Sequence, residues 1–346
     1  MPEAVTADEI LTTGVRNLWY PIAPSWQVQS HPVGLTRLGE RIVLWRDGAG
    51  RVHALEDRCP HRGARLSLGW NLGDRLGCWY HGIEVDGTGT VCKVPAVENC
   101  PLEGQQSVRA YPVRESNGGI FAWFGDALHR EPGPLQLPEE MTDPDYDSFL
   151  CTAFWRCNYR YAIDNVMDPM HGAYLHAESH SMAGGAKRAR MRINPTPTGF
   201  VFEKEDQKGI NFDWVEFGNT GAHWLKLAIP YRPSAGPGGH FWICGFVTPV
   251  DARTCQVYFW RVRKVQGWQR DMWRFLFRTR LEGKHWAVLE QDRLMLEAME
   301  ADARDHEFLY QHDTGLARVR RLMETEAKAQ AEALASHAAK SSAAAQ

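Results

Sequence analysis

CPHRG at residues 59–63 and CWYHG at residues 78–82 are the two short motifs that decide how the first third of the chain folds. Each motif places one cysteine shortly before one histidine: Cys59 precedes His61, and Cys78 precedes His81. Both motifs follow strand-like segments and end on a glycine, which permits the tight turn of a loop. The pattern therefore predicts two facing loops whose four side chains bind one metal centre.

Two kinds of metal centre could use these four ligands. A Rieske [2Fe–2S] cluster has two thiolates on one iron and two imidazoles on the other, and the neutral imidazoles raise its potential to roughly −150 to +300 mV. A structural zinc site typically pairs like ligands, as C-x₂₋₄-C and H-x₃₋₅-H. Here each pair mixes Cys with His, and a single residue separates Cys59 from His61. The spacing favours a Rieske cluster bound by Cys59, His61, Cys78 and His81, and a zinc site is the alternative.

A second candidate site lies in DNVMDPMHGAYLH, residues 164–176. On an ideal helix His171 and His176 would lie about 140° apart around the axis, because one turn has 3.6 residues. They can share a metal only if the helix ends or breaks between them, and Gly172 is a suitable place. Asp168 lies three residues before His171, close enough for the Asp–His hydrogen bond that orients a ligating imidazole.

Two histidines and one carboxylate on one side of an iron form the facial triad of non-haem Fe(II) oxygenases, which leaves positions open for O₂ and substrate. The third ligand must come from another segment, and the helical stretch LEQDRLMLEAME at 289–300 offers Glu290, Asp292 and Glu297. Asp292 lies on the apolar stripe of this stretch, where an unpaired carboxylate would be costly and a metal would offset the cost. An exposed edge of the helix is the alternative position for Asp292.

The chain of 346 residues is long enough for two domains. Short strands separated by Gly and Asp turns are followed by a proline-rich stretch, and then by successive strands that favour an antiparallel sheet. The predicted class is α+β, with an all-β domain before an α+β domain that has an antiparallel sheet and helices. The predicted divisions are an N-terminal tail at 1–16, the all-β domain at 17–125, a linker at 126–147, the α+β domain at 148–315, and a C-terminal helix with a disordered tail at 316–346.

Local patterns also predict individual elements. Gly-containing turns at 47–50, 86–89 and 116–119 separate β-prone segments and predict hairpins. The predicted strands are 41–45, 51–55, 149–155, 199–205, 222–231, 239–247 and 255–265, and the predicted helices are 159–167, 268–299 and 316–335.

Charge and composition exclude several classes of protein. A net charge of −3 gives no attraction to nucleic acid or to an anionic membrane surface. No apolar run approaches the roughly 18 residues needed to cross a bilayer, and the first residues lack the apolar core of a secretory signal. Of the eight cysteines, only Cys59 and Cys78 have histidines at ligand-like spacing, so a disulfide scaffold is not expected. We expect a cytoplasmic protein that binds neither nucleic acid nor membranes.

The motifs together resemble those of one known family. CPHRG and CWYHG are similar to the cluster loops of Rieske-type oxygenases, and NLWYPI at 17–22 is similar to the usual start of their Rieske domain. Residues 164–176 match the D-N-x-x-D-x-x-H-x₄-H signature of their catalytic domains. EQDRLMLE at 290–297 resembles their late helix, with Gln291 where that helix has Glu. Trp79 and Ile83 replace a proline and an aromatic residue of the usual second loop.

The resemblance spans roughly residues 17–300 and implies a Rieske [2Fe–2S] domain followed by a helix-grip, START-like catalytic domain. The chain looks most like the alpha-only phthalate group, which includes phthalate dioxygenase and vanillate O-demethylase. His180 has no counterpart in the signature and is not an expected ligand. The resemblance implies that Cys59, His61, Cys78 and His81 bind the cluster and that His171, His176 and Asp292 bind one mononuclear Fe²⁺.

Asp168 and Asn165 are the further catalytic residues that the resemblance implies, and they lie three residues apart on one face. Asp168 would be the electron bridge between His171 and the cluster ligand His81 of a neighbouring subunit, which implies a homotrimer. The implied function is the terminal oxygenase of a multicomponent system. It would take electrons from an NAD(P)H-dependent reductase with flavin and a ferredoxin-type centre, and would use O₂ to hydroxylate a small aromatic, for example an aromatic carboxylate.

Two alternative functions stay open at this stage, besides the zinc site named above. The substrate could be non-aromatic, such as a quaternary amine or a steroid. The chain could be a Rieske electron carrier fused to a ligand-binding domain without a second iron. An aromatic acid would need a cationic residue near it; Arg188, Arg190, Arg192 and Lys226 are candidates, and surface charge is the alternative for each.

Overall fold

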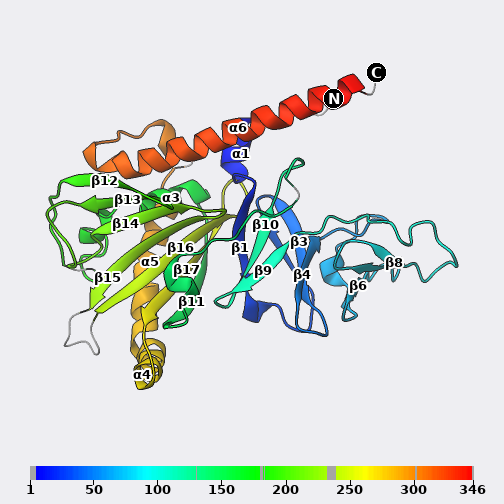
Figure 1. Cartoon of the computed structure of the whole chain (residues 1–346), viewed down its shortest axis with the longest axis horizontal. Helices are drawn as coiled ribbons and strands as arrows, with labels where there is room; N and C mark the ends of the chain where they lie inside the picture. Colours follow the sequence, from blue (N-terminus) through cyan, green and yellow to red (C-terminus); the bar gives the residue numbers. More distant parts are fainter. Residues whose placement is uncertain are drawn as a thin grey trace.

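The computed structural model describes residues 5–129, 131–179, 182, 184–231, 239–300 and 302–344. Small β-sheets occupy one end of an elongated molecule, and one large sheet with helices occupies the other (Figure 1). The order of elements along the chain confirms the predicted α+β class, with an all-β unit before an α+β unit.

The N-terminal domain is built from short strands: β1 (Leu18–Pro24), β2 (Val33–Arg37), β3 (Glu40–Arg46), β4 (Val52–Glu56), β5 (Trp70–Asn71), β6 (Arg75–Gly77), β7 (Glu84–Asp86), β8 (Val91–Lys93), β9 (Val113–Ser116) and β10 (Gly119–Phe124). They form three antiparallel sheets with the orders β1-β10-β9, β2-β3-β4 and β5-β6-β7-β8. Each predicted hairpin turn joins two of these strands. In the β9–β10 turn, Asn117 and Gly118 have φ of 50° and 73°, as a two-residue turn of this kind requires.

The C-terminal domain contains one antiparallel sheet: β11 (Tyr146–Trp155), β12 (Met191–Thr196), β13 (Gly199–Lys204), β14 (Trp214–Asn219), β15 (His223–Tyr231), β16 (Gly239–Pro249) and β17 (Cys255–Lys264). Its order is β11-β17-β16-β15-β14-β13-β12, so β12 to β17 are neighbours in sequence and in space, and β11 lies beside β17. The sequence did not predict β12 and β14. Strand β12 includes Pro195, which a sheet tolerates there because β12 is the edge strand.

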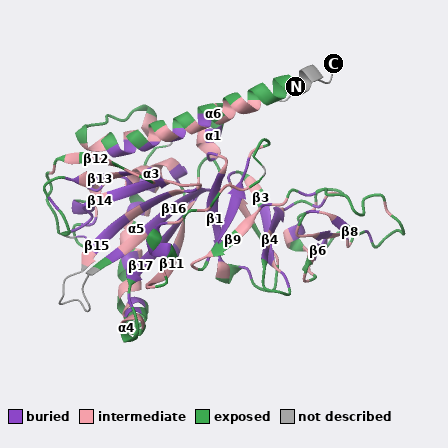
Figure 2. Ribbon diagram, in the orientation of Figure 1, coloured by how far each residue is buried: buried purple, intermediate pink, exposed green. Residues whose placement is uncertain are grey.

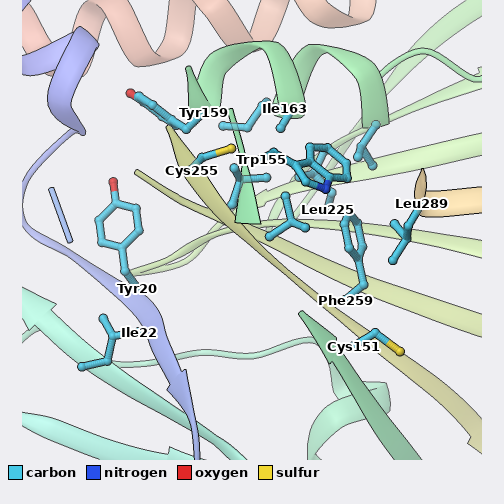
Figure 3. Packing of buried hydrophobic residues seen from close by; sticks show 14 of the residues in the cluster. Tyr20, Ile22, Cys151, Trp155, Tyr159, Ile163, Leu225, Cys255, Phe259 and Leu289 are labelled. Carbon is cyan, nitrogen blue, oxygen red and sulfur yellow. The ribbon is translucent and has the colours of Figure 1, made fainter. Parts of the chain in front are cut away.

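The central strands of the large sheet are buried on both faces. Successive side chains of a strand point to opposite faces, so one strand contributes to two cores. In β17, Val257 belongs to the core beneath the helices, and so does Phe259, which is labelled in Figure 3. Tyr258 and Trp260 belong instead to a second core, which includes Trp19 of the N-terminal domain. Buried residues accordingly run the length of the central strands (Figure 2). The second core joins the two domains.

The helices are α1 (Ala7–Thr13), α2 (Glu139–Thr142), α3 (Tyr159–Val166), α4 (Trp268–Leu276), α5 (Glu282–Glu297) and α6 (Thr314–Ala344). A π-helical segment, Phe277–Leu281, joins α4 to α5, so the predicted helix over 268–299 is interrupted once. No helix among these described segments has both the length and the apolar character that spanning a membrane requires.

Helices occupy the first and the last segments of the chain that the structure describes. Disorder was expected over 336–346, but α6 continues to Ala344, so that prediction was wrong there; alanine, which is frequent in this stretch, is the best helix former. The N-terminal tail contains α1, which packs against α6. Thr6 and Glu9 form a capping box: Glu9 N–H donates to Thr6 Oγ1 at 3.2 Å, and Thr6 N–H donates to the Glu9 carboxylate at 2.8 Å.

The segment predicted as a linker, 126–147, packs on the rest of the molecule. Asn17 Nδ2 donates to Asp126 Oδ2 at 2.8 Å, and Trp19 Nε1 donates to the Gly133 carbonyl at 2.8 Å. Leu135 packs against the core between the domains. These contacts make the segment a packed connection between the domains.

Candidate functional site: two metal-binding centres

The two Cys–His motifs fold into loops with the same hydrogen bonds. The cysteine N–H donates to the carbonyl five residues later, at 2.7 Å from Cys59 and at 2.8 Å from Cys78. The N–H of Gly63 donates back to the Cys59 carbonyl at 2.9 Å, and that of Gly82 to the Cys78 carbonyl at 2.8 Å. These glycines have φ of 75° and 73°, a region that other residues rarely adopt. The predicted tight turns are therefore present in both loops.

The four side chains of the loops are arranged with thiols inside and imidazoles outside. Cys59 and Cys78 are 2% and 1% exposed. Burial raises the pKa of the Cys59 thiol to about 11, and the neighbouring Cys78 thiol raises it too. His61 and His81 are exposed, and their Nδ1 atoms face each other at 3.2 Å. This arrangement fits a Rieske cluster, in which the inner iron takes the thiolates and the outer iron takes the imidazoles.

The second site begins where the chain leaves α3. Helix α3 ends at Val166, before either histidine, and a separate 3₁₀ turn covers His171–Ala173. The two histidines therefore do not share one continuous helix, but the helix does not break at Gly172, which lies inside the 3₁₀ turn. His171 Nδ1 lies 2.6 Å from the Asp168 carbonyl oxygen, and His176 Nδ1 lies 2.8 Å from Gln291 Oε1. Since both acceptors need an Nδ1–H donor, each ring keeps Nε2 free to bind a metal.

Asp292 of α5 completes this site. Its Oδ1 lies 3.2 Å from His176 Nε2 and 3.6 Å from His171 Nε2. One ligand atom from each of the three residues lies within 4.8 Å of the others. Asp292 is 6% exposed, and its Oδ1 has no hydrogen-bond partner among the described residues. A buried carboxylate oxygen without a donor, facing two imidazole nitrogens, is what a divalent metal would satisfy.

The remaining carboxylates of the late helix have other partners. Glu290 and Glu297 both accept hydrogen bonds from Arg293, and Glu297 also accepts one from the Arg156 N–H at 2.9 Å. Of the three candidate acids, only Asp292 lies with the histidines.

Burial lowers the pKa of His171, which favours the neutral imidazole that a metal needs.

Asp168 and Asn165 lie beside the three converging side chains. The predicted bond between the Asp168 carboxylate and His171 was wrong: the main-chain carbonyl of Asp168 faces His171, and the carboxylate accepts from the Met170 N–H at 2.7 Å. Asn165 contributes its main-chain carbonyl to the Asp168 N–H at 3.2 Å. The part of the chain that the structure describes provides no hydrogen-bond partner for the Asn165 side chain. His180 lies outside the described residues.

The cationic residues suggested by the sequence lie away from this site. Arg188 is exposed, and Arg190 and Arg192 pair with acids of the neighbouring segment (Asp206 and Glu203). Lys226 pairs with Glu140 and Glu216 and stacks over aromatic residues of the core between the domains, on the face opposite the helices. The sequence patterns missed two residues: Gln291, which orients His176, and Arg261, which is buried on the helix-covered face of the large sheet. The alternation of β17 was the available signal for Arg261.

Comparison with family models supports both centres. Residues 18–112 match the model of the Rieske [2Fe-2S] domain, and residues 155–329 match that of the vanillate O-demethylase oxygenase C-terminal domain. The second match alone covers half of the chain.

Individual relatives agree with these matches. The vanillate O-demethylase oxygenase subunit of Pseudomonas sp. (strain HR199 / DSM 7063) is 35% identical over 164 residues, which are 47% of this chain and 46% of that one. The oxygenase component of dicamba O-demethylase from Stenotrophomonas maltophilia is 37% identical over 164 residues, 47% of this chain and 48% of that one. The matched regions thus span about half the length of these relatives.

Solved structures agree in fold over nearly the whole chain. Dicamba monooxygenase bound to dicamba has a TM-score of 0.74 at 24% identity, covering 92% of this chain and 98% of that one. The terminal oxygenase of carbazole 1,9a-dioxygenase from Novosphingobium sp. KA1 has a TM-score of 0.77 at 22% identity, with coverages of 93% and 95%. From its two family models, the chain belongs to the Rieske oxygenases, as an alpha subunit of the group that shares the vanillate O-demethylase oxygenase C-terminal domain.

Proposed function

We propose that this protein is the terminal oxygenase of a multicomponent system, which uses O₂ and electrons from an NAD(P)H-dependent reductase to hydroxylate a small aromatic substrate. The observation that carries the proposal is the convergence of His171 Nε2, His176 Nε2 and Asp292 Oδ1 on one point. Three protein ligands on one side of a ferrous ion leave other positions free for oxygen and substrate. A pure electron carrier would have no use for this second site.

In the proposed assignment, His171, His176 and Asp292 hold the mononuclear iron, and Cys59, His61, Cys78 and His81 hold the cluster. When bound, the mononuclear iron would supply O₂ activation and the cluster would supply single electrons.

The chain's own groups prepare the mononuclear site. The Asp168 carbonyl and the Gln291 amide oxygen keep a proton on Nδ1 of each histidine and direct Nε2 inward. Burial of His176 and Asp292, at 1% and 6% exposure, keeps bulk water from competing at this point. Hydroxylation of a ring, or of an O-methyl carbon with loss of formaldehyde, is compatible with the same arrangement.

We propose that the two centres communicate between neighbouring copies of the chain, in a ring of three. The cluster loops carry two exposed aromatic residues, Trp79 and Tyr80, at 66% and 58% exposure. Exposed aromatic residues also occur near Asp168. Tyr310 is 57% exposed. It lies close enough to Asp168 for the charge of that carboxylate, after burial of part of the ring, to raise the pKa of Tyr310. Two such aromatic surfaces suit an interface between copies.

We also propose the cytoplasm as the compartment, where NAD(P)H is available.

Iron content and single turnover together test the proposal. The purified protein should contain three iron atoms per chain, two from the cluster and one from the second site, and reduced protein should show the low-temperature magnetic resonance signal of a Rieske cluster. Pre-reduced protein mixed with O₂ and a panel of benzoates, methoxybenzoates and phthalates should yield hydroxylated or demethylated product. Two iron atoms per chain and no product would support the electron carrier instead, and a colourless zinc protein would exclude both.

A further inference from the structure

The loop that connects β13 to β14, residues 205–213, and the lysine before it carry buried polar side chains that belong to neither metal centre. Lys204 and Asp213, at the two ends of the loop, are 0% and 1% exposed. Gln207 and Asn211, within the loop, are 7% and 1% exposed. Lysine and aspartate are almost never buried to this extent unless they are paired, so this group of side chains needs a cause.

The two ends of the loop are joined by a backbone bond and by opposite charges. The Lys204 N–H donates to the Asp213 carbonyl at 2.9 Å. Lys204 Nζ lies 3.7 Å from Asp213 Oδ1 and has no hydrogen-bond partner among the described residues. Burial lowers the pKa of Lys204, and the negative charges of Asp213 and Asp168 oppose that shift. Lys204 thus supplies the opposite charge that the buried carboxylate of Asp213 needs.

The Asp213 carboxylate holds the loop in shape. Its Oδ2 accepts from the Ile210 N–H at 2.9 Å and from the Asn211 N–H at 3.2 Å. Its Oδ1 accepts from Gln207 Nε2. Phe212 stands between Asn211 and Asp213 in the chain, so the bonds on either side of it fix the direction of its side chain.

Two amide side chains tie the loop to the segment that follows His176. Asn211 Nδ2 donates to the carbonyls of Met182 and Gly184. Gln207 Oε1 accepts from the Ala186 N–H. The loop is therefore held at its base by the ion pair and along its length by a second segment.

Phe212 is the point at which the loop meets the mononuclear site. Its ring is 2% exposed and packs edge-on against that of His171, with centroids 5.6 Å apart and an interplanar angle of 76°. A Cβ added at Gly172 would lie 3.5 Å from both Phe212 Cδ1 and Met182 Cε, so the main chain after His171 also packs on this loop. The Asp168 carbonyl fixes the imidazole by a hydrogen bond, and Phe212 fixes it by contact.

We infer that Asp213, with Lys204 as its counter-charge, is a positioning residue for the iron ligand His171 and acts through Phe212. The inference rests on the proposed function, in which His171 binds the mononuclear iron, and adds the residues that hold this ligand in place. Groups behind a ligating imidazole typically change metal affinity by about 10- to 100-fold when they are replaced. Gln291 positions His176 by a hydrogen bond, whereas this loop positions His171 by packing.

A double-mutant cycle on the metal-loaded protein tests the inference. The variants are Asp213→Asn, Phe212→Leu and the two together. The control is Phe217→Leu, which shortens a side chain of β14 that is 0% exposed and contacts the rings of Phe200 and His223. Iron retained against increasing chelator gives the affinity of the mononuclear site. The visible absorbance of the cluster and thermal unfolding are measured in parallel.

Asp213→Asn and Phe212→Leu should each lower the affinity for the mononuclear iron by ~10-fold and leave the cluster absorbance unchanged. The double variant should lose no more affinity than Phe212→Leu alone, because both changes act on one contact. Phe217→Leu should lose thermal stability to a similar extent as Phe212→Leu, since both leave a cavity in the same core, but should keep the iron affinity of the wild type.

The outcomes separate this inference from the proposed function. Iron affinity at the wild-type level in Asp213→Asn or Phe212→Leu would overturn the inference, while a wild type with three iron atoms that oxidises substrate would leave the oxygenase intact. An equal loss of iron from Phe217→Leu would also overturn it, because iron affinity would then follow general stability. Additive losses in the double variant would show that Asp213 does not act through Phe212. A wild type with two iron atoms per chain would refute the proposed function and the inference with it.

Discussion

At the scale of single residues, Gln291 orients His176 with a neutral amide oxygen where the resembling helices have a carboxylate. The hydrogen bond is 2.8 Å long and joins residues 115 positions apart in the chain. It holds the imidazole in the tautomer whose Nε2 faces Asp292. Iron affinity should therefore depend on a residue that is not itself a ligand.

Replacing Gln291 tests that dependence. Gln291→Ala should lower the affinity of the mononuclear site for iron by about 10- to 100-fold, because the ring loses its orienting acceptor. Gln291→Glu should retain or raise the affinity, since a carboxylate is the stronger acceptor. Iron retained against increasing chelator measures both, with Glu290→Gln as the control on the same helix. Wild-type retention in Gln291→Ala would contradict this role.

Asp168 is expected to act through its charge. Asp168→Asn keeps an oxygen that can accept from the Met170 N–H, so the turn should survive and both metal centres should remain loaded. Turnover with the reductase should nevertheless fall by ~10²-fold, because a neutral amide cannot make the charge-assisted hydrogen bond proposed to join the two centres. Steady-state oxygen uptake, with metal content measured in parallel, checks this. Normal turnover in Asp168→Asn would remove Asp168 from the proposed route between centres.

At the scale of elements, the two cluster loops have the same backbone form but different surroundings. A Cβ added at Gly82 would lie 3.3 Å from Pro95 Cγ, closer than most side chains tolerate. A Cβ added at Gly63 would meet only Arg58 Nε at 3.5 Å, which is ordinary contact. The loops should therefore differ in how they tolerate alanine.

Alanine at each glycine measures the difference. Both variants should lose about 1–2 kcal/mol from the left-handed backbone conformation. Gly82→Ala should lose more and should bind less cluster, because a rigid proline ring must also move. Thermal unfolding and the visible absorbance of the cluster report the two effects. Equal losses in the two variants would mean that Pro95 yields without cost.

At the scale of the whole molecule, Glu40 ties distant segments together. Its carboxylate accepts from Arg16 Nη1 at 2.5 Å, from the Tyr111 hydroxyl at 2.6 Å and from Arg109 Nη1 at 3.1 Å. The Arg16 main chain bonds in both directions to Gln330 of α6, at 2.9 and 2.7 Å. The Glu40 carboxylate thus joins the N-terminal segment to the first domain, and through the Arg16 main chain this connection extends to the last helix.

Stability should depend on pH through Glu40. Burial alone would raise the pKa of Glu40, but Arg16, Tyr111 and Arg109 together hold it below its ordinary value of 4.5. A carboxyl whose folded-state pKa is lowered stabilises the fold above its unfolded pKa and loses this effect as the pH falls through the folded value. Glu40→Gln should cost about 1–3 kcal/mol at pH 7, and the gap from wild type should close below pH 4.5. Denaturant unfolding from pH 7 to pH 3 measures the gap; a constant gap would rule out ionisation as the cause.

The sequence by itself determined the features whose chemistry is local. The loops at 59–63 and 78–82 and the hairpin turns each depend on a few consecutive residues, so local spacing and turn residues predicted them. Tertiary structure decided what depends on distant contacts. The apolar stripe and the family resemblance favoured Asp292 over Glu290 and Glu297, but only packing of α5 on the segment after α3 brings its carboxylate to the two histidines. Proximity between residues a hundred or more positions apart is a property of the folded chain, and no local pattern encodes it.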